Sequence, residues 1–124
     1  MAVDVSEIVQ EQLEAYNARD LERFVACYAD TVSIYRMPAT DAAISGKAQL
    51  AAVYKDRFSS PSLHAEILAR IILGNKVIDH ERVRGIREHP IEALAIYEVA
   101  SGLIQTVWFF YPEKPFPTVS TLVK

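Results

Sequence analysis

The sequence has 124 residues, of which 51% are hydrophobic and 23% are charged, and its formal net charge at pH 7 is −3. This length suits one domain with a hydrophobic core, and the composition excludes a disordered chain. The acidic balance without lysine-rich runs excludes a nucleic-acid partner, whose phosphates need a basic surface, and no apolar run is long enough to cross a membrane.

The only cysteine, Cys27, excludes an internal disulfide, and no Cys/His spacing typical of a zinc site is present. The first residues lack the basic and then apolar pattern of a secretion signal. We therefore expect a cytoplasmic protein. Cys27 has no evident histidine partner, so it is expected to be a small core residue.

Residues 1–60 are predicted to form a helical half that contains one short strand. Asp4 followed by Glu7 resembles a capping box, and the apolar residues after it recur at helical spacing. This pattern predicts a first helix over about residues 4 to 18. Asp20 is then the expected N-cap of a second, short helix.

The stretch "TVSIYRMP" alternates and stops at Pro38, which predicts a short strand that ends where proline blocks pairing. Ser45 is the expected cap of a third helix, which buries Leu50 and Tyr54 along one side. The stretch "SSPS" at 59–62 ends that helix.

Residues 61–112 are rich in Ile, Val, Leu and aromatic residues and are interrupted by the turn signals "GN", "IREHP" and "SG". The predicted strands are 63–73, 77–85, 91–100 and 103–111. Consecutive strands with tight reversals form an antiparallel meander, so helices followed by this sheet predict an α+β domain in two layers. The last segment, "PEKPFPTVSTLVK", contains three prolines and no helical pattern, and residues 113–124 are predicted to be an extended arm.

Tight turns also predict which side chains share a face, because side chains alternate along a strand. With Gly74 and Asn75 as the first turn, Arg70 lies opposite Asp79, and Glu81 and His64 share their face. With Ser101 and Gly102 as the later turn, Glu98 lies opposite Gln105 and points inward by the same reasoning.

The opposite face of the sheet is also largely apolar under this pairing, and three helices cover one side only. We therefore expect a homodimer through the second face, unless the C-terminal arm folds back over it. The residues assigned to that face are Ala65, Ile67, Ala69, Ile71, Ile78, Ala95, Ile104, Trp108 and Phe110.

Three blocks, "IVQEQLEAYNARDLERFVACYAD", "GKAQLAAVYKDRF" and "AIYEVASGLIQTVWFFYPEK", resemble the nuclear transport factor 2-like superfamily. Within it they resemble the SnoaL-like polyketide-cyclase and ketosteroid-isomerase-like branch, over about residues 5 to 114. The resemblance implies a cone-shaped, cystatin-like α+β fold, in which a curved antiparallel sheet wraps around three N-terminal helices and leaves a ligand pocket. Such folds carry many activities and also domains without chemistry.

The steroid-isomerase site does not carry over to this sequence, although two supporting tyrosines match at Tyr28 and Tyr54. The familiar isomerase mechanism is therefore not expected. The positions that the resemblance assigns to the oxyanion tyrosine, the carboxylate base and the second carboxylate hold Gln12, Arg36 or Met37, and Ile96 or Tyr97.

The candidate catalytic residues are Glu98, Asp79 and His64, which the strand pairing and the resemblance together place on the inner face. Crowded carboxyls in an apolar cone do not all stay ionised, so one acid beside one base is available for proton transfer. The expected pocket-lining residues are Tyr28, Tyr54, Glu81, Arg70, Arg36, Tyr111 and Phe109.

The predicted function is that of a small-molecule pocket protein, with a cofactor-free isomerisation, dehydration or cyclisation of a small apolar substrate. The alternative is a non-catalytic ligand-binding or dimerisation domain, in which Arg70 and Asp79 form only a cross-strand ion pair. No cofactor is expected, and because no ligand spacing is diagnostic of a metal, no metal site is expected.

Overall fold

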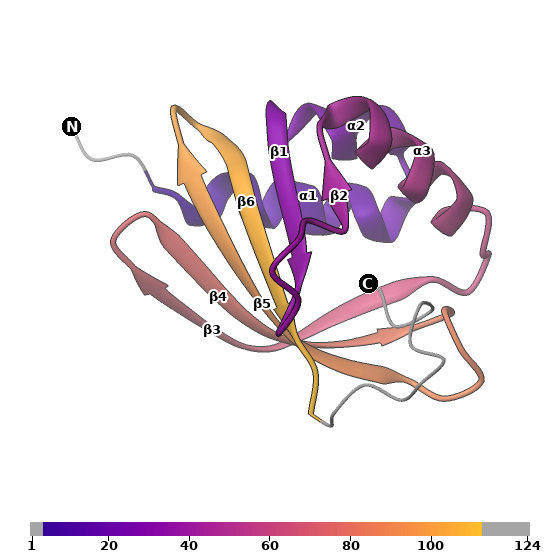
Figure 1. The fold of residues 1–124 in the computed structure, drawn as a ribbon. Coiled ribbons are helices and arrows are strands. Elements are labelled where there is room, and N and C mark those ends of the chain that lie inside the picture. Colours follow the sequence, from indigo (N-terminus) through magenta and orange to yellow (C-terminus); the bar gives the residue numbers. More distant parts are fainter. Residues whose placement is uncertain (1–3, 113–124) are drawn as a thin grey trace.

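The computed structural model describes residues 4–112, which form helices and strands in the order that Figure 1 shows. The predicted arm at 113–124 lies outside the described residues. The elements are α1 (Ser6–Ala18), α2 (Leu21–Ala26), β1 (Tyr28–Arg36), β2 (Ile44–Ser45), α3 (Lys47–Arg57), β3 (His64–Leu73), β4 (Lys76–Arg84), β5 (Ile91–Ala100) and β6 (Leu103–Phe110).

The strands form one curved sheet in the order β2-β1-β6-β5-β4-β3, and α1, α2 and α3 lie on its concave side (Figure 1). Strands β3 to β6 pair antiparallel with their neighbours in sequence, so the predicted meander and the α+β fold class are confirmed. The pairing of β1 differs from an all-antiparallel sheet, because β1 runs parallel to β6. This parallel pair joins the helical half to the meander.

The helix starts agree only in part with the predicted caps. The Asp20 carboxylate accepts a hydrogen bond from the Arg23 backbone N–H at 3.2 Å, as predicted. Asp4 accepts from the Ser6 N–H at 3.0 Å, but Val5 is the N-cap of α1. Ser45 was the wrong cap for α3, because it lies in β2.

Gly46 takes the N-cap position of α3 with a φ of 87°. This left-handed backbone conformation favours glycine and is not helical. The helix therefore cannot begin at Gly46, and Ser45, the residue before it, cannot be the N-cap. The Ser45 N–H instead donates to the Gln49 Oε1 at 2.8 Å, a side chain one turn inside the helix.

Both predicted two-residue turns are present, since Leu73 pairs with Lys76 and Ala100 pairs with Leu103. The residues between them adopt the positive φ angles that such turns require: 60° at Gly74, and 54° and 77° at Ser101 and Gly102. The strand ends are therefore placed as predicted, and any change of face must arise farther along each hairpin.

Each hairpin contains one extra residue that reverses the predicted faces beyond it. In β3, Ile67 pairs with Glu81 and Ala69 with His80, which leaves Leu68 as a bulge. A bulge puts two residues opposite one and shifts the alternation of side chains by one position. Residues of β3 before Leu68 therefore face the opposite side from the one predicted.

The same change occurs between β5 and β6. Val99 pairs with Ile104 and Glu98 with Thr106, so Gln105 is the extra residue. Tyr97 then pairs with Val107, and Ala95 with Phe109. These four residues are buried on the concave side, whereas Glu98 belongs to the convex side.

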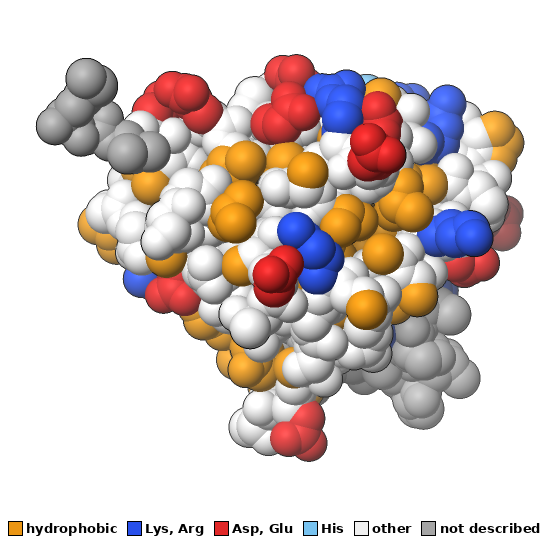
Figure 2. Space-filling model, turned by 90° about the horizontal axis from the view of Figure 1, so that it is seen from above, with side chains coloured by type: hydrophobic (Ala, Val, Ile, Leu, Met, Phe, Trp, Pro, Cys, Tyr) orange, Lys and Arg blue, Asp and Glu red, His pale blue; other side chains and the backbone are white. Residues whose placement is uncertain are grey.

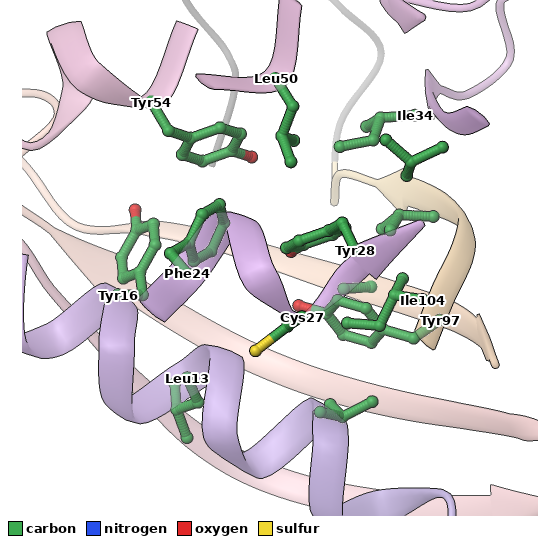
Figure 3. Close-up of a cluster of buried hydrophobic side chains, with 14 of the residues drawn as sticks. Leu13, Tyr16, Phe24, Cys27, Tyr28, Ile34, Leu50, Tyr54, Tyr97 and Ile104 are labelled. Atoms are coloured by element: carbon green, nitrogen blue, oxygen red, sulfur yellow. The ribbon is translucent and has the colours of Figure 1, made fainter. Parts of the chain in front are cut away.

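The core lies between the helices and the concave face, with Phe24 at the centre of an aromatic cluster (Figure 3). The ring of Phe24 has no exposed surface and lies 4.7 Å from the ring of Tyr54, 5.0 Å from Tyr28 and 5.3 Å from Phe58, between centroids. Tilted and edge-on aromatic pairs at such distances add to the free energy gained by burial. The cluster ties α1, α2 and α3 to the start of β1.

The surface seen from above in Figure 2 carries acidic, basic and hydrophobic side chains in mixture, without a large area of one charge. Among the described residues, no helix has the length and apolar character needed to cross a membrane. The longest, α1, has 13 residues. Neither feature points to a particular partner on this side of the molecule.

Candidate functional site

The concave face of β4 carries two acidic residues that are fully enclosed. Asp79 and Glu81 each have 0% exposed surface, and they alternate with the buried Val77 and Val83. This placement is the one that the alternation in the sequence predicts. Two carboxyls removed from water within one core need specific partners, because an isolated buried charge is costly.

Asp79 has its partner in Arg70, which lies opposite on β3. The Arg70 Nε donates to the Asp79 Oδ1 at 2.6 Å and the Arg70 Nη2 to the Asp79 Oδ2 at 2.9 Å. The third donor, Nη1, bonds the Gln10 Oε1 on α1 at 2.9 Å. The hydrogen bond with Asp79 raises the pKa of Arg70, so the pair is a fixed, charge-assisted fork. Arg70 therefore links the buried carboxylate of Asp79 on the sheet to Gln10 on α1.

Glu81 lies among the phenols of the core. Its negative charge contributes to raising the pKa of five tyrosines, although burial is the larger cause in each of them. All five hydroxyls therefore lie within electrostatic range of this carboxylate. The five are Tyr16, Tyr28, Tyr54, Tyr97 and Tyr111.

Gln12 links two of these phenols. The Tyr28 hydroxyl donates to the Gln12 Oε1 at 3.1 Å, and the Gln12 Nε2 donates to the Tyr97 hydroxyl at 3.3 Å. All three side chains are at most 2% exposed. The network orients Tyr28, a predicted pocket residue, and gives a structural purpose to a glutamine that the isomerase resemblance had left without a role.

Tyr111 and Tyr54 lie near two arginines at the end of the site. Burial raises the pKa of both phenols, while the positive charges of Arg36 and Arg57 act to lower it. The Tyr111 hydroxyl is buried and forms no hydrogen bond within residues 4–112. Arg36 was predicted at this rim. Arg57 was not, because a basic residue in the last turn of a helix is ordinary.

Glu98, the leading catalytic candidate from sequence, does not reach this site. Its side chain is 32% exposed on the convex side, where the Thr106 Oγ1 donates to it at 3.1 Å and the Lys76 Nζ lies 3.7 Å away. The bulge at Gln105 is the physical reason, because it moves Tyr97 into the inward position. The prediction of an inward Glu98 was wrong.

His64 was also placed on the wrong face. It begins β3 opposite the exposed Arg84, and the bulge at Leu68 turns it away from Asp79. Phe109 lies on the concave face as predicted, with 2% exposed surface. The structure thus brings Asp79, Glu81 and the tyrosines together and leaves both other catalytic candidates outside.

The arrangement combines one carboxylate held by an arginine, a second carboxyl that is fully buried, and several phenols that can donate hydrogen bonds. These are the parts that proton transfer next to a carbonyl requires. Within residues 4–112, no group of three or more His, Cys, Asp or Glu side chains is arranged to hold a metal ion.

A family model described as a SnoaL-like domain matches residues 9–107. No curated protein matches the sequence. Among solved structures, an uncharacterised cystatin-fold protein from Novosphingobium aromaticivorans is similar, with a TM-score of 0.79 and 22% identity over 87% of this chain and 98% of that chain.

Two further solved structures have proposed activities. A protein from Kribbella flavida, proposed to be a ketosteroid isomerase, has a TM-score of 0.74 and 22% identity over 97% of this chain and 87% of that chain. A protein from Sinorhizobium meliloti, proposed to be a polyketide cyclase, has a TM-score of 0.72 and 16% identity over 86% of this chain and 99% of its own. At these identities the likeness establishes the cystatin-like fold alone.

Proposed function

The chain belongs to the SnoaL-like domain family, and from this premise we propose a small-molecule pocket protein that performs cofactor-free acid–base chemistry on a small, largely apolar carbonyl compound. The observation that carries the proposal is the full burial of Glu81 among tyrosine hydroxyls. The activities proposed for two structural neighbours, ketosteroid isomerase and polyketide cyclase, favour carbonyl substrates.

Glu81 is the proposed base. Burial removes the water that stabilises a carboxylate, and this makes a carboxylate a better proton acceptor. Asp79 is less suited to the task, because both of its oxygens accept hydrogen bonds from Arg70. The fork fixes Asp79 as a charged anchor on β4, and Glu81 is the carboxyl to which we assign the proton transfer.

Tyr111 and Tyr54 are the proposed hydrogen-bond donors to the substrate oxygen. Burial raises the pKa of both phenols, so both carry their proton at neutral pH and can donate. The Tyr111 hydroxyl forms no hydrogen bond with any of residues 4–112 and is therefore available. The substrate would enter beside Arg36 and Arg57, whose charges act on the same two phenols.

In the proposed step, the Glu81 carboxylate removes a proton from the carbon next to the substrate carbonyl. The electron pair of the broken C–H bond forms an enolate, whose oxygen accepts hydrogen bonds from the phenols. Glu81 then holds the proton as a carboxylic acid. Returning it to another carbon isomerises the substrate, and passing it to a β-hydroxyl group that leaves as water dehydrates the substrate.

Deuterium exchange tests this proposal without knowledge of the natural substrate. Cyclohexanone and larger cyclic ketones are incubated with the protein in D₂O, and NMR follows the loss of protons next to the carbonyl. We expect accelerated exchange that falls by about 100-fold or more in Glu81→Gln, the range that general acid–base catalysis supplies. Glu98→Gln is the matched control, because Glu98 lies on the convex face. The exchange rate of this variant is expected to equal that of the wild type.

Exchange that survives Glu81→Gln, or that Glu98→Gln abolishes, would refute the assignment of the base. The second candidate function is ligand binding without catalysis, and the Gln12 network favours it, because Gln12 engages the hydroxyls of Tyr28 and Tyr97. Under that function, saturation-transfer NMR detects bound ketone while the protons next to the carbonyl do not exchange.

A further inference from the structure

The last turn of α3 carries a half-buried arginine on the side of the helix that faces the core. Arg57 follows Tyr54 by three residues, and residues three apart in a helix lie on the same side of it. Tyr54 is 1% exposed and extends from α3 into the aromatic cluster (Figure 3). Arg57 is half-buried, whereas Lys55 in the same turn is exposed. Arg57 therefore continues the buried side of α3 to the end of the helix.

A second half-buried arginine lies at the end of β1, on the concave side of the sheet. Arg36 follows Ile34 by two residues, so the two side chains share one side of the strand, and Ile34 is 1% exposed in the core. Arg36 pairs with Phe109 on β6, which is buried on the concave face and precedes Tyr111 by two residues. Arg36 and Tyr111 therefore lie at the same end of the concave site.

Two phenols lie within reach of both arginines and of the buried acid. The positive charges of Arg36 and Arg57 act to lower the pKa of Tyr54 and Tyr111, against the larger effect of burial. The negative charge of Glu81 acts on the same two phenols in the opposite direction. Both hydroxyls are therefore within electrostatic range of a carboxyl and of two guanidinium groups.

Arg57 differs from Arg70, the arginine on the other side of the core, in what it binds. The Arg70 Nε lies 2.6 Å from the Asp79 Oδ1, whereas the Arg57 side chain forms no ion pair or hydrogen bond with any of residues 4–112. A guanidinium group presents a planar fork that matches a carboxylate with two parallel hydrogen bonds. A half-buried fork without an acid from the described chain is suited to a carboxylate on a ligand.

We propose that the substrate is a keto acid whose carboxylate binds the guanidinium group of Arg57, while Arg36 adds positive charge at the same end of the site. This inference rests on the proposed function, which puts the carbonyl oxygen of the substrate at Tyr54 and Tyr111. With the oxygen there, the carbon that loses its proton faces Glu81, and a carboxylate on the other side of the carbonyl faces the arginines. The two positive charges also attract an anionic substrate to the site.

Calorimetric titration of the full chain with two matched probes tests the proposal. The probes are 2-oxo-4-phenylbutanoate and 4-phenyl-2-butanone, which differ only in a carboxylate or a methyl group beside the carbonyl. We expect the keto acid to bind about 10-fold or more tightly than the ketone, because hydrogen bonds to a charged group are the stronger ones.

Three variants identify the residue that binds the carboxylate. Arg57→Gln is expected to weaken binding of the keto acid by about 10- to 100-fold and to leave binding of the ketone unchanged. Arg57→Lys keeps the charge but not the planar fork, so an intermediate loss is expected. Lys55→Gln is the matched control, because Lys55 is an exposed basic residue in the same turn of α3, and its affinities are expected to equal those of the wild type.

Deuterium exchange of the protons next to the carbonyl of the same two probes separates this inference from the proposed function. Binding of the keto acid that depends on Arg57, without exchange in either probe, would refute the acid–base chemistry and leave the carboxylate site standing. Equal affinities for the two probes, or no binding of either, would overturn the carboxylate site. A folded Arg57→Gln variant, checked by circular dichroism, that binds the keto acid like the wild type would overturn it too.

Discussion

Replacing Arg70 with methionine is expected to destabilise the fold strongly, because it leaves the carboxylate of Asp79 buried without its partner. Asp79 has no exposed surface, and Arg70, which supplies both hydrogen bonds to it, is 21% exposed. Removing one member of a buried ion pair costs about 3–5 kcal/mol, and the partial exposure of Arg70 favours the lower value. We therefore expect a loss of about 3 kcal/mol in Arg70→Met.

For a chain of 124 residues, an unfolding entropy of about 2.1 cal/mol/K per residue converts this loss into a fall in Tm of roughly 10 °C. Urea unfolding followed by circular dichroism measures the free energy directly. Arg82→Met is the matched control, because Arg82 and Glu66 are exposed and lie 3.6 Å apart, and its cost is expected to be at most about 0.5 kcal/mol.

The double variant Arg70→Met with Asp79→Asn decides whether the ion pair is the cause. Removing the charge of Asp79 should restore about 2 kcal/mol, since a neutral amide is less costly to bury than an unpaired carboxylate. A cost below about 1 kcal/mol in Arg70→Met, or no rescue by Asp79→Asn, would refute the reasoning that Asp79 is an anchored charge.

Two further outcomes test the core and the strand ends. Above pH 10.0, the five core tyrosines (Tyr16, Tyr28, Tyr54, Tyr97 and Tyr111) should ionise only as the protein unfolds, because burial raises their pKa and the protonated form stabilises the fold. Their stabilising effect is complete below the ordinary value of 10.0 and is lost as pH rises through the folded-state pKa. The measurement uses a Tyr35→Phe variant, because Tyr35 is the one tyrosine outside this buried set, and tyrosinate absorbance of this variant that rises before circular dichroism changes would contradict the prediction. Gly85→Ala should cost more than Gly74→Ala in urea unfolding, although both glycines have positive φ, because a Cβ at Gly85 would lie 2.6 Å from the Leu63 backbone and one at Gly74 meets nothing within 4 Å. Equal costs would show that the backbone near Leu63 yields easily.

The sequence was sufficient to predict the fold class, the meander, both tight turns and the inward direction of Asp79 and Glu81. The alternation of side chains accounts for the inward direction of the two acids, because Val77 and Val83 flank them at intervals of two residues and only one side of the strand could be that apolar. The sequence also predicted that Arg70 lies opposite Asp79, since the turn at Gly74 fixes the strand pairing close to the turn.

The faces of His64 and Glu98 could not be predicted, because each lies beyond a bulge. Leu68 and Gln105 are the extra residues, and neither is the glycine or proline that marks an irregular strand. One uncounted residue reverses every side chain that follows it. Arg57 was missed for another reason: its position depends on how α3 packs over the concave face, which no local pattern encodes.

The most direct test of Glu81 as the group that meets the ligand is NMR of protein labelled with ¹³C at the glutamate carboxyl carbons. Signals are assigned through Glu81→Gln and Glu98→Gln, and 2-naphthol is added as a planar mimic of an enolate. The account predicts that the Glu81 signal shifts with naphthol concentration while the Glu98 signal stays constant, since Glu81 lies on the concave face and Glu98 on the convex face. A constant Glu81 signal during saturable binding of naphthol elsewhere would contradict it.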